Sequence, residues 1–149
     1  MTDTFWMQQA LDLAHKACSE GEVPVGAVLV SDQNQLLSQG WNQVMQLQDP
    51  TAHAEMVAIR DACAHLDNYR LLNTTLYVTL EPCCMCAGAL VHARIKRLVF
   101  ATRDWKAGAA GSVHNLLHGY PLNHQIQIDE GVLQHDCALL LTNFFKTLR

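Results

Sequence analysis

The chain has 149 residues, of which 50% are apolar and 16% charged, and its net charge is −4 with neutral histidines. This balance is typical of one globular domain with a real core, and it excludes intrinsic disorder. No apolar run approaches the roughly 18 residues that span a bilayer. The N-terminal residues also lack the pattern of a secretory signal. We therefore expect a single cytoplasmic domain over residues 1–149, with no membrane contact.

The spacing of apolar residues predicts helices that alternate with strands. In chain order we expect a helix over 4–19, strands over 24–30 and 35–42, a helix over 53–66, a strand over 75–80, a helix over 83–93, a strand over 97–102, a loop over 104–125, a short strand over 126–129 and a helix over 132–147. The first two strands are expected to form a hairpin, and the strands around 83–93 to be parallel. This order predicts a layered α/β domain with helices on both faces of the sheet.

A C-x-x-C pair opens the helix predicted at 83–93. One helical turn brings the Cys83 and Cys86 sulfurs to one side, where they can share a metal. Two thiolates and the imidazole of His53 favour zinc over magnesium or calcium. Taken alone, the pair also fits a redox couple or half of a structural zinc site. A second C-x-x-C, or an H-x(3–5)-H in register with the first, is absent from the sequence.

Three protein ligands leave one tetrahedral position open, which is the pattern of a catalytic zinc. Zinc lowers the pKa of a water in that position to about 7, and the resulting nucleophile needs a proton carrier beside it. Glu55 stands two residues from His53, at the same predicted helix start. We expect it to be this carrier, although side chains two apart diverge on a regular helix. The alternative is a glutamate favoured there by the helix dipole.

The motifs His53-Ala54-Glu55 and Pro82-Cys83-x-x-Cys86 match the H-x-E…P-C-x-x-C signature of zinc-dependent nucleobase deaminases. Within this cytidine/deoxycytidylate deaminase superfamily, the chain resembles the bacterial tRNA-specific adenosine deaminases. The stretches that carry the resemblance are 22–28, 40–42, 49–55, 77–83, 85–89 and 108–112. They extend over nearly the whole chain.

The resemblance implies a three-layer α/β/α cytidine-deaminase-like fold with a central, mixed, mostly five-stranded sheet. It also implies hydrolytic deamination of adenosine to inosine at the wobble position of a tRNA anticodon loop, by a zinc-bound hydroxide, in a homodimer. One zinc per chain would be bound by His53, Cys83 and Cys86, with Glu55 as the proton shuttle. Asn42 is expected to bind the purine edge, while Val25 and Ala54 shape the pocket and Asp104 contacts a neighbouring nucleotide.

Further RNA contacts are expected outside the two zinc-binding motifs. Five of the ten Lys and Arg residues lie in one window, at 94, 96, 97, 103 and 106. Arg103 and Lys106 flank Trp105, which stands where the family often has a smaller residue and which either stacks a base or caps the loop. Phe144 and Phe145 stand where the family places an aromatic near the RNA, and Phe144 is the expected contact. The alternative for the window is a solvated loop. Gly108-Ala-Ala-Gly111 lacks the Lys-Ser/Thr of a P-loop, so we expect no nucleotide cofactor.

Two other functions compete with the tRNA reaction. A deaminase of a free nucleobase or nucleoside, of guanine or cytosine type, would use the same zinc site, and the net negative charge favours such a small substrate. A zinc-stabilised binding module without turnover is the third reading. The open coordination position and Glu55 argue against it.

Overall fold

The computed structural model describes residues 1–118 and 124–148. Ten helices and strands follow one another in these residues. They are α1 (Asp3–Ser19), β1 (Gly26–Ser31), β2 (Leu36–Trp41), α2 (Val44–Leu47), α3 (Ala54–Leu66), β3 (Thr74–Leu80), α4 (Cys84–His92), β4 (Arg97–Thr102), β5 (Gln127–Glu130) and α5 (Gln134–Thr147). Part of the loop expected over 104–125, residues 119–123, lies outside the described residues.

The five strands form one mixed sheet in the order β2-β1-β3-β4-β5. β1 is antiparallel to both β2 and β3, whereas β3, β4 and β5 are parallel to one another. The expected hairpin and the parallel strands around α4 are therefore confirmed. The parallel part places the carboxyl ends of three strands at one edge of the sheet.

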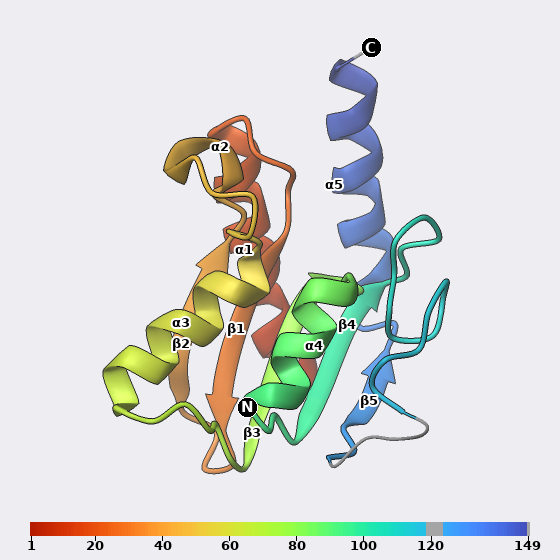
Figure 1. The fold of residues 1–149 in the computed structure, drawn as a ribbon. Coiled ribbons are helices and arrows are strands. Elements are labelled where there is room, and N and C mark those ends of the chain that lie inside the picture. The colour runs from red at the N-terminus through yellow and green to blue at the C-terminus, as the bar shows by residue number, and fades with distance from the viewer. Residues whose placement is uncertain (119–123, 149) are drawn as a thin grey trace.

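Helices cover both faces of the sheet, so the expected three layers are confirmed. α3 and α4 lie on one face, and α1 and α5 lie on the other (Figure 1). Alternate strand residues supply the two cores because successive side chains of a strand point to opposite faces. Leu29, Leu76 and Leu98 belong to the core under α3 and α4. Val28 and Val99 belong to the core under α1 and α5.

A glycine sets how closely α3 approaches the sheet. A Cβ atom at Gly40 in β2 would overlap the backbone of Ala54 and Ala58 on α3. The absence of a side chain therefore lets the first turns of α3 pack directly on β2. The buried hydroxyl of Ser38 adds a hydrogen bond to the carbonyl of Ala58, at 2.7 Å. The start of α3 is thus fixed relative to the strand ends.

Most expected boundaries agree with the structure to within one residue, and three differences are larger. β1 begins at Gly26 rather than at 24, and α5 begins at Gln134 rather than at 132. The short helix α2 was not expected, because its four residues carry no apolar period. It is held by a residue that is distant in sequence, since the buried Glu22 carboxylate accepts the backbone N–H groups of Met45 and Gln46 at 2.9–3.2 Å. None of the described helices combines the length and apolarity needed to cross a membrane.

Candidate metal centre and active site

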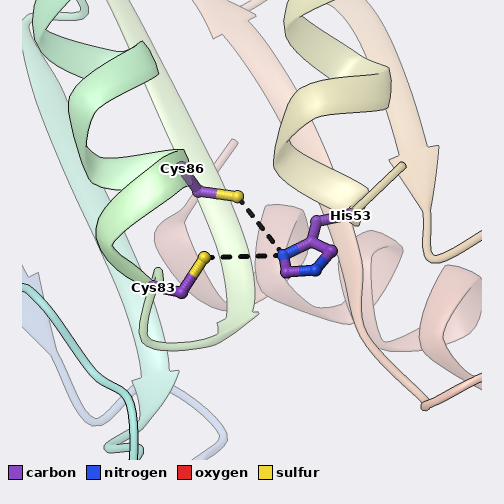
Figure 2. Close-up of side chains that lie close together, drawn as sticks. All are labelled: His53, Cys83 and Cys86. Carbon is purple, nitrogen blue, oxygen red and sulfur yellow. Dashed lines mark hydrogen bonds between the residues drawn. The ribbon is translucent and has the colours of Figure 1, made fainter. Parts of the chain in front are cut away.

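Three side chains from two helix starts converge at the edge of the sheet. The Nδ1 atom of His53 lies 3.5 Å from the Cys83 sulfur and 3.6 Å from the Cys86 sulfur. All three ligand atoms lie within 4.8 Å of one another, and Figure 2 shows them pointing toward a common centre. The sequence-predicted ligand set is therefore brought together by the fold.

The spacing fits a tetrahedral zinc. With zinc bonds of about 2.3 Å to sulfur and about 2.0–2.1 Å to nitrogen, the tetrahedral angle separates nitrogen from sulfur by about 3.6 Å. The two observed nitrogen–sulfur distances agree with this value. The donor set of one imidazole and two thiols also suits zinc rather than a hard, oxygen-seeking cation.

His53 and Cys83 occupy the N-cap positions of α3 and α4, with extended backbone. The positive end of the helix dipole therefore faces a potential thiolate. Hydrogen bonds from Cys86 and His53 hold the pKa of the Cys83 thiol at about 3, far below its ordinary value. The bond to Cys83 and burial raise the pKa of Cys86. A metal cation deprotonates coordinating thiols outright, so it would favour both as thiolates.

Glu55 lies beside these ligands and is 4% exposed. It shares a cavity of about 220 Å³ with His53 and Cys83. His53 and Glu55 belong to the same short motif and are two residues apart, yet both line this cavity. They can do so because His53 precedes α3, so its side chain does not follow the angular period of the helix. Burial raises the pKa of Glu55 to about 7. A carboxyl group with this pKa can both accept and donate a proton near neutrality.

Asn42 and Val25 also line the cavity. The Asn42 Oδ1 atom accepts the backbone N–H of Ala54 at 2.7 Å, so this asparagine caps α3 from a neighbouring element. That bond fixes the orientation of the Asn42 amide. The NH₂ group is then the part of the amide that can donate a hydrogen bond to a ligand. Ala54 itself is fully buried and does not line the cavity.

The loop after β4 is anchored by Glu81, a residue that sequence reasoning missed. Its carboxylate is 2% exposed and accepts the backbone N–H groups of Asp104, Ala110 and Ser112 at 2.9–3.1 Å. The Ser112 hydroxyl donates to it as well. A Cβ atom at Gly108 would overlap this carboxyl group. The one available signal was a charged residue directly after the buried strand 75–80.

The anchored loop brings Asp104 to the cavity, which it lines. One Asp104 carboxylate oxygen accepts the N–H groups of Lys106 and Ala107 at 3.0 and 3.1 Å. The second oxygen has no protein hydrogen bond among the described residues. Arg103 forms two hydrogen bonds with Glu130, at 2.9 and 2.8 Å, so its guanidinium is already paired.

The basic window does not form one surface. Arg97 begins β4 and pairs with Asp3 and Asp129, while Arg103 follows the other end of that strand. Six strand residues separate these ends by roughly 20 Å. The first three cations of the basic window, at positions 94, 96 and 97, therefore lie away from the metal ligands. Phe144 is half-buried and, unlike its neighbour Phe145, does not line the groove between the 103–106 loop and α5.

Comparisons with known proteins agree with this geometry. Residues 1–102 match the model of the cytidine and deoxycytidylate deaminase zinc-binding region. Over 147 residues the chain is 51% identical to the tRNA-specific adenosine deaminase of Haemophilus influenzae, covering 99% of this chain and 85% of that one. The chain belongs to the tRNA-specific adenosine deaminase family. The tRNA-specific adenosine deaminase of Bacillus subtilis is 44% identical and covers 99% of this chain and 91% of its own.

Solved structures of relatives share the fold of this deaminase. A tRNA:A34 deaminase, studied for A-to-I editing at the wobble position of transfer RNA, superposes with a TM-score of 0.89 and 40% identity, over 93% of this chain and 99% of that one. A guanine deaminase from Bacillus subtilis is 39% identical, with a TM-score of 0.67, over 75% of this chain and 71% of that one. The match to the family model includes the three residues of the metal cluster and Glu55. Asp104 and Phe145 lie beyond its end at residue 102.

Proposed function

We propose that this deaminase converts adenosine to inosine at the wobble position of a tRNA anticodon loop. The observation that carries the proposal is the metal-binding cluster of His53, Cys83 and Cys86, with Glu55 in the cavity that His53 and Cys83 also line, in a chain whose relatives are named for that reaction. The reaction adds water at adenine C6 and releases ammonia. Its requirements are a water nucleophile, a proton carrier and a site that orients the purine.

We assign one zinc ion per chain to His53, Cys83 and Cys86. A zinc ion bound there would lower the pKa of a coordinated water to about 7 and supply the nucleophile. Replacing Cys86 with Ala should abolish stoichiometric zinc, which metal analysis after purification measures. The matched control is Cys84→Ala, because Cys84 is exposed and lies outside the cluster. A Cys86→Ala protein that keeps one zinc per chain contradicts the assignment.

Glu55 is assigned the proton transfers. Its carboxylate accepts a proton from the nucleophilic water and delivers it to N1 of the adenine ring. The same carboxyl group then takes the proton of the hydroxyl added at C6 and gives it to the leaving amine, so that ammonia departs and the C6 carbonyl forms. The raised pKa supports both directions, because a group that titrates near 7 loses and regains its proton at little cost.

The remaining residues orient the purine. Because the Asn42 oxygen is occupied by the Ala54 N–H, its amide NH₂ group donates to an acceptor on the purine edge. Val25 provides an apolar wall. Ala54 acts through its backbone, which holds Asn42 in this orientation. Asp104 is assigned to a nucleotide beside the target, since it lines both this cavity and the groove next to it.

The partner is a tRNA whose anticodon loop presents its base. Sequence-specific RNA recognition targets such loops because their bases can be splayed out without melting a helix. We also propose a homodimer, as the resemblance to the family implies. Light scattering during size-exclusion chromatography tests it, and a monomer at micromolar concentration overturns it. A cytoplasmic location follows from the tRNA substrate.

A second candidate is deamination of a free nucleobase. The likeness to a guanine deaminase at 39% identity favours it, because that relative shares the cytidine-deaminase-like scaffold. The net charge of −4 is also compatible with a small substrate. Both candidates use the same metal cluster, so only the substrate distinguishes them.

Initial rates decide between the two. Purified protein is offered an anticodon stem-loop with adenosine at the wobble position, and free adenosine, cytidine and guanine, at equal concentration and stated salt. We expect inosine in the stem-loop and negligible turnover of the free compounds, because binding energy from neighbouring nucleotides can be used at the reacting carbon. A faster rate on any free compound would reverse the assignment.

A further inference from the structure

A second, larger cavity opens beside the metal centre. It has a volume of about 770 Å³ and lies between the 103–106 loop and α5, the helix that extends past the end of β4 in Figure 1. Val23, Leu80 and Asp104 line both this groove and the cavity that holds Glu55. The two spaces are therefore neighbours that share these three side chains.

Two exposed aromatic residues line this groove. Trp105 is 71% exposed and Phe145 is 45% exposed, and they come from the loop and from α5 respectively. The other two tryptophans are not presented in this way. Trp6 is buried, and Trp41 is half-buried with its indole N–H bonded to Glu20. Tryptophan is enriched among the residues that dominate binding interfaces, so two exposed aromatic rings on one groove indicate a candidate binding surface.

The indole of Trp105 is held in place from behind. The Arg103 guanidinium lies 5.3 Å from the ring centroid, within range of a cation–π contact. Arg103 is in turn fixed by its two hydrogen bonds to Glu130. This stack presents a preorganised ring, and the exposed fraction of Trp105 leaves area for another planar group.

Positive charge accompanies the aromatic pair. Lys106 and Lys146 both line the groove. Neither forms an ion pair within the part of the chain that the structure describes. Planar rings next to free ammonium groups match the chemistry of a single-stranded nucleotide, whose base stacks while its phosphate is neutralised.

We propose that Trp105 and Phe145 form a stacking site for the base immediately next to the reacting adenosine. The proposal rests on the proposed function, because the occupant is the substrate RNA. The groove lies next to the cavity assigned to the adenine, so the adjacent nucleotide is the part of the RNA that reaches it first. Trp105 is then a binding residue that positions the loop without touching the reacting carbon.

Single-site variants and modified stem-loops test this site together. Loss of one base–aromatic stack weakens binding by about five- to 150-fold, the range that corresponds to stacking by alanine substitution. We expect Trp105→Ala to lower kcat/KM on the stem-loop within that range, and Trp105→Phe to restore most of it. Phe145→Ala should act in the same direction.

The matched control is Tyr69→Ala. Tyr69 is equally exposed, at 73%, and also carries an arginine, Arg70, at 5.6 Å from its ring. It lies beyond the far end of α3, which is about 20 Å long from its first residue at the metal centre. Loss of this ring should leave kcat/KM unchanged. Zinc content and circular dichroism of each variant report folding.

Stem-loops with an abasic site on the 5′ or the 3′ side of the target identify the stacked base. If the proposal holds, one of these substrates removes the effect of Trp105→Ala, and 2-aminopurine at the same position is quenched on binding the unmodified protein. An effect of equal size on both abasic substrates and on the intact one overturns the stacking site. So does a Trp105→Ala rate within twofold of the parent.

The two proposals fail in different ways. If the parent protein deaminates a free base faster than the stem-loop, the proposed function falls, and the stacking site falls with it. If the parent acts on the stem-loop while Trp105→Ala and the abasic substrates behave like their controls, only the stacking site is overturned.

Discussion

Glu81 determines where the substrate-facing loop lies, and Glu81→Gln measures that role. The two carboxylate oxygens accept three backbone N–H groups and one hydroxyl group from the loop at 104–112. Glutamine offers one oxygen and one NH₂ group. In the best orientation the NH₂ group replaces Oε1, and the Ser112 hydroxyl rotates to accept from it. The Asp104 N–H then loses its acceptor.

The expected loss of stability follows from that count. One orphaned N–H costs about 1–3 kcal/mol, and the bonds that remain become neutral and weaker by several tenths each. We therefore expect Glu81→Gln to lower the free energy of unfolding by about 2–4 kcal/mol. For a chain of this length, that corresponds to a fall in Tm of roughly 5–15 °C. The opposite amide orientation orphans two N–H groups and costs more.

Urea unfolding of the zinc-loaded protein at fixed free zinc measures the change. Glu20→Gln is the matched control, because Glu20 accepts a single bond from Trp41 that an amide oxygen can replace. Hydrogen exchange supplies the local readout, since the amides of Asp104, Ala110 and Ser112 should lose protection. The reasoning is refuted if the two variants differ by less than about 1 kcal/mol and the exchange of these amides is unchanged.

Three further results are expected. Glu55→Ala should fold and keep zinc while its deamination rate falls by at least about 10²–10⁴-fold; a rate within tenfold of the parent would remove Glu55 from the mechanism. Lys106→Ala should flatten the salt dependence of RNA affinity by about 0.7 log units, whereas Arg103→Ala should change the slope less because its guanidinium is ion-paired; equal slopes in titrations of both variants contradict this. Asp3→Asn should lose about 1 kcal/mol near neutral pH, because the hydrogen bond from Arg97 lowers the Asp3 pKa; urea titrations should find this difference shrinking as the pH falls below the ordinary value of 3.8.

The sequence predicted the parts of this molecule that depend on local period and short motifs. The strands that flank α4 could be predicted because a strand buried on both faces of a parallel sheet is a nearly continuous apolar run. The spacing of Cys83 and Cys86 was sufficient to group them, since one helical turn brings them together. The three ligands now lie at distances that fit a zinc ion.

Long-range hydrogen bonds were beyond such patterns. Glu22 and Glu81 each bind backbone N–H groups that lie more than 20 residues away, and one isolated carboxylate leaves no period to detect. The helix α2 escaped prediction for the same reason, because its first turn is held by Glu22. The structure places Phe145 rather than Phe144 on the groove, and the expected contact of Phe144 with RNA stays a prediction. Helical spacing separates Phe144 from Phe145 but does not say which one faces the groove.

The placement of the chemistry at helix starts has one physical origin. An N-cap residue has extended backbone, so its side chain is free of the helical period and can point over the end of the helix. His53 and Cys83 both use this freedom, and each leaves the first N–H groups of its helix to other partners. Asn42 supplies one such partner for α3, and the same bond fixes its donor toward the cavity. A substitution of Asn42 by Asp would keep the cap but remove the donor. It should therefore preserve the fold and the zinc while reducing purine binding, which separates the two roles of one amide.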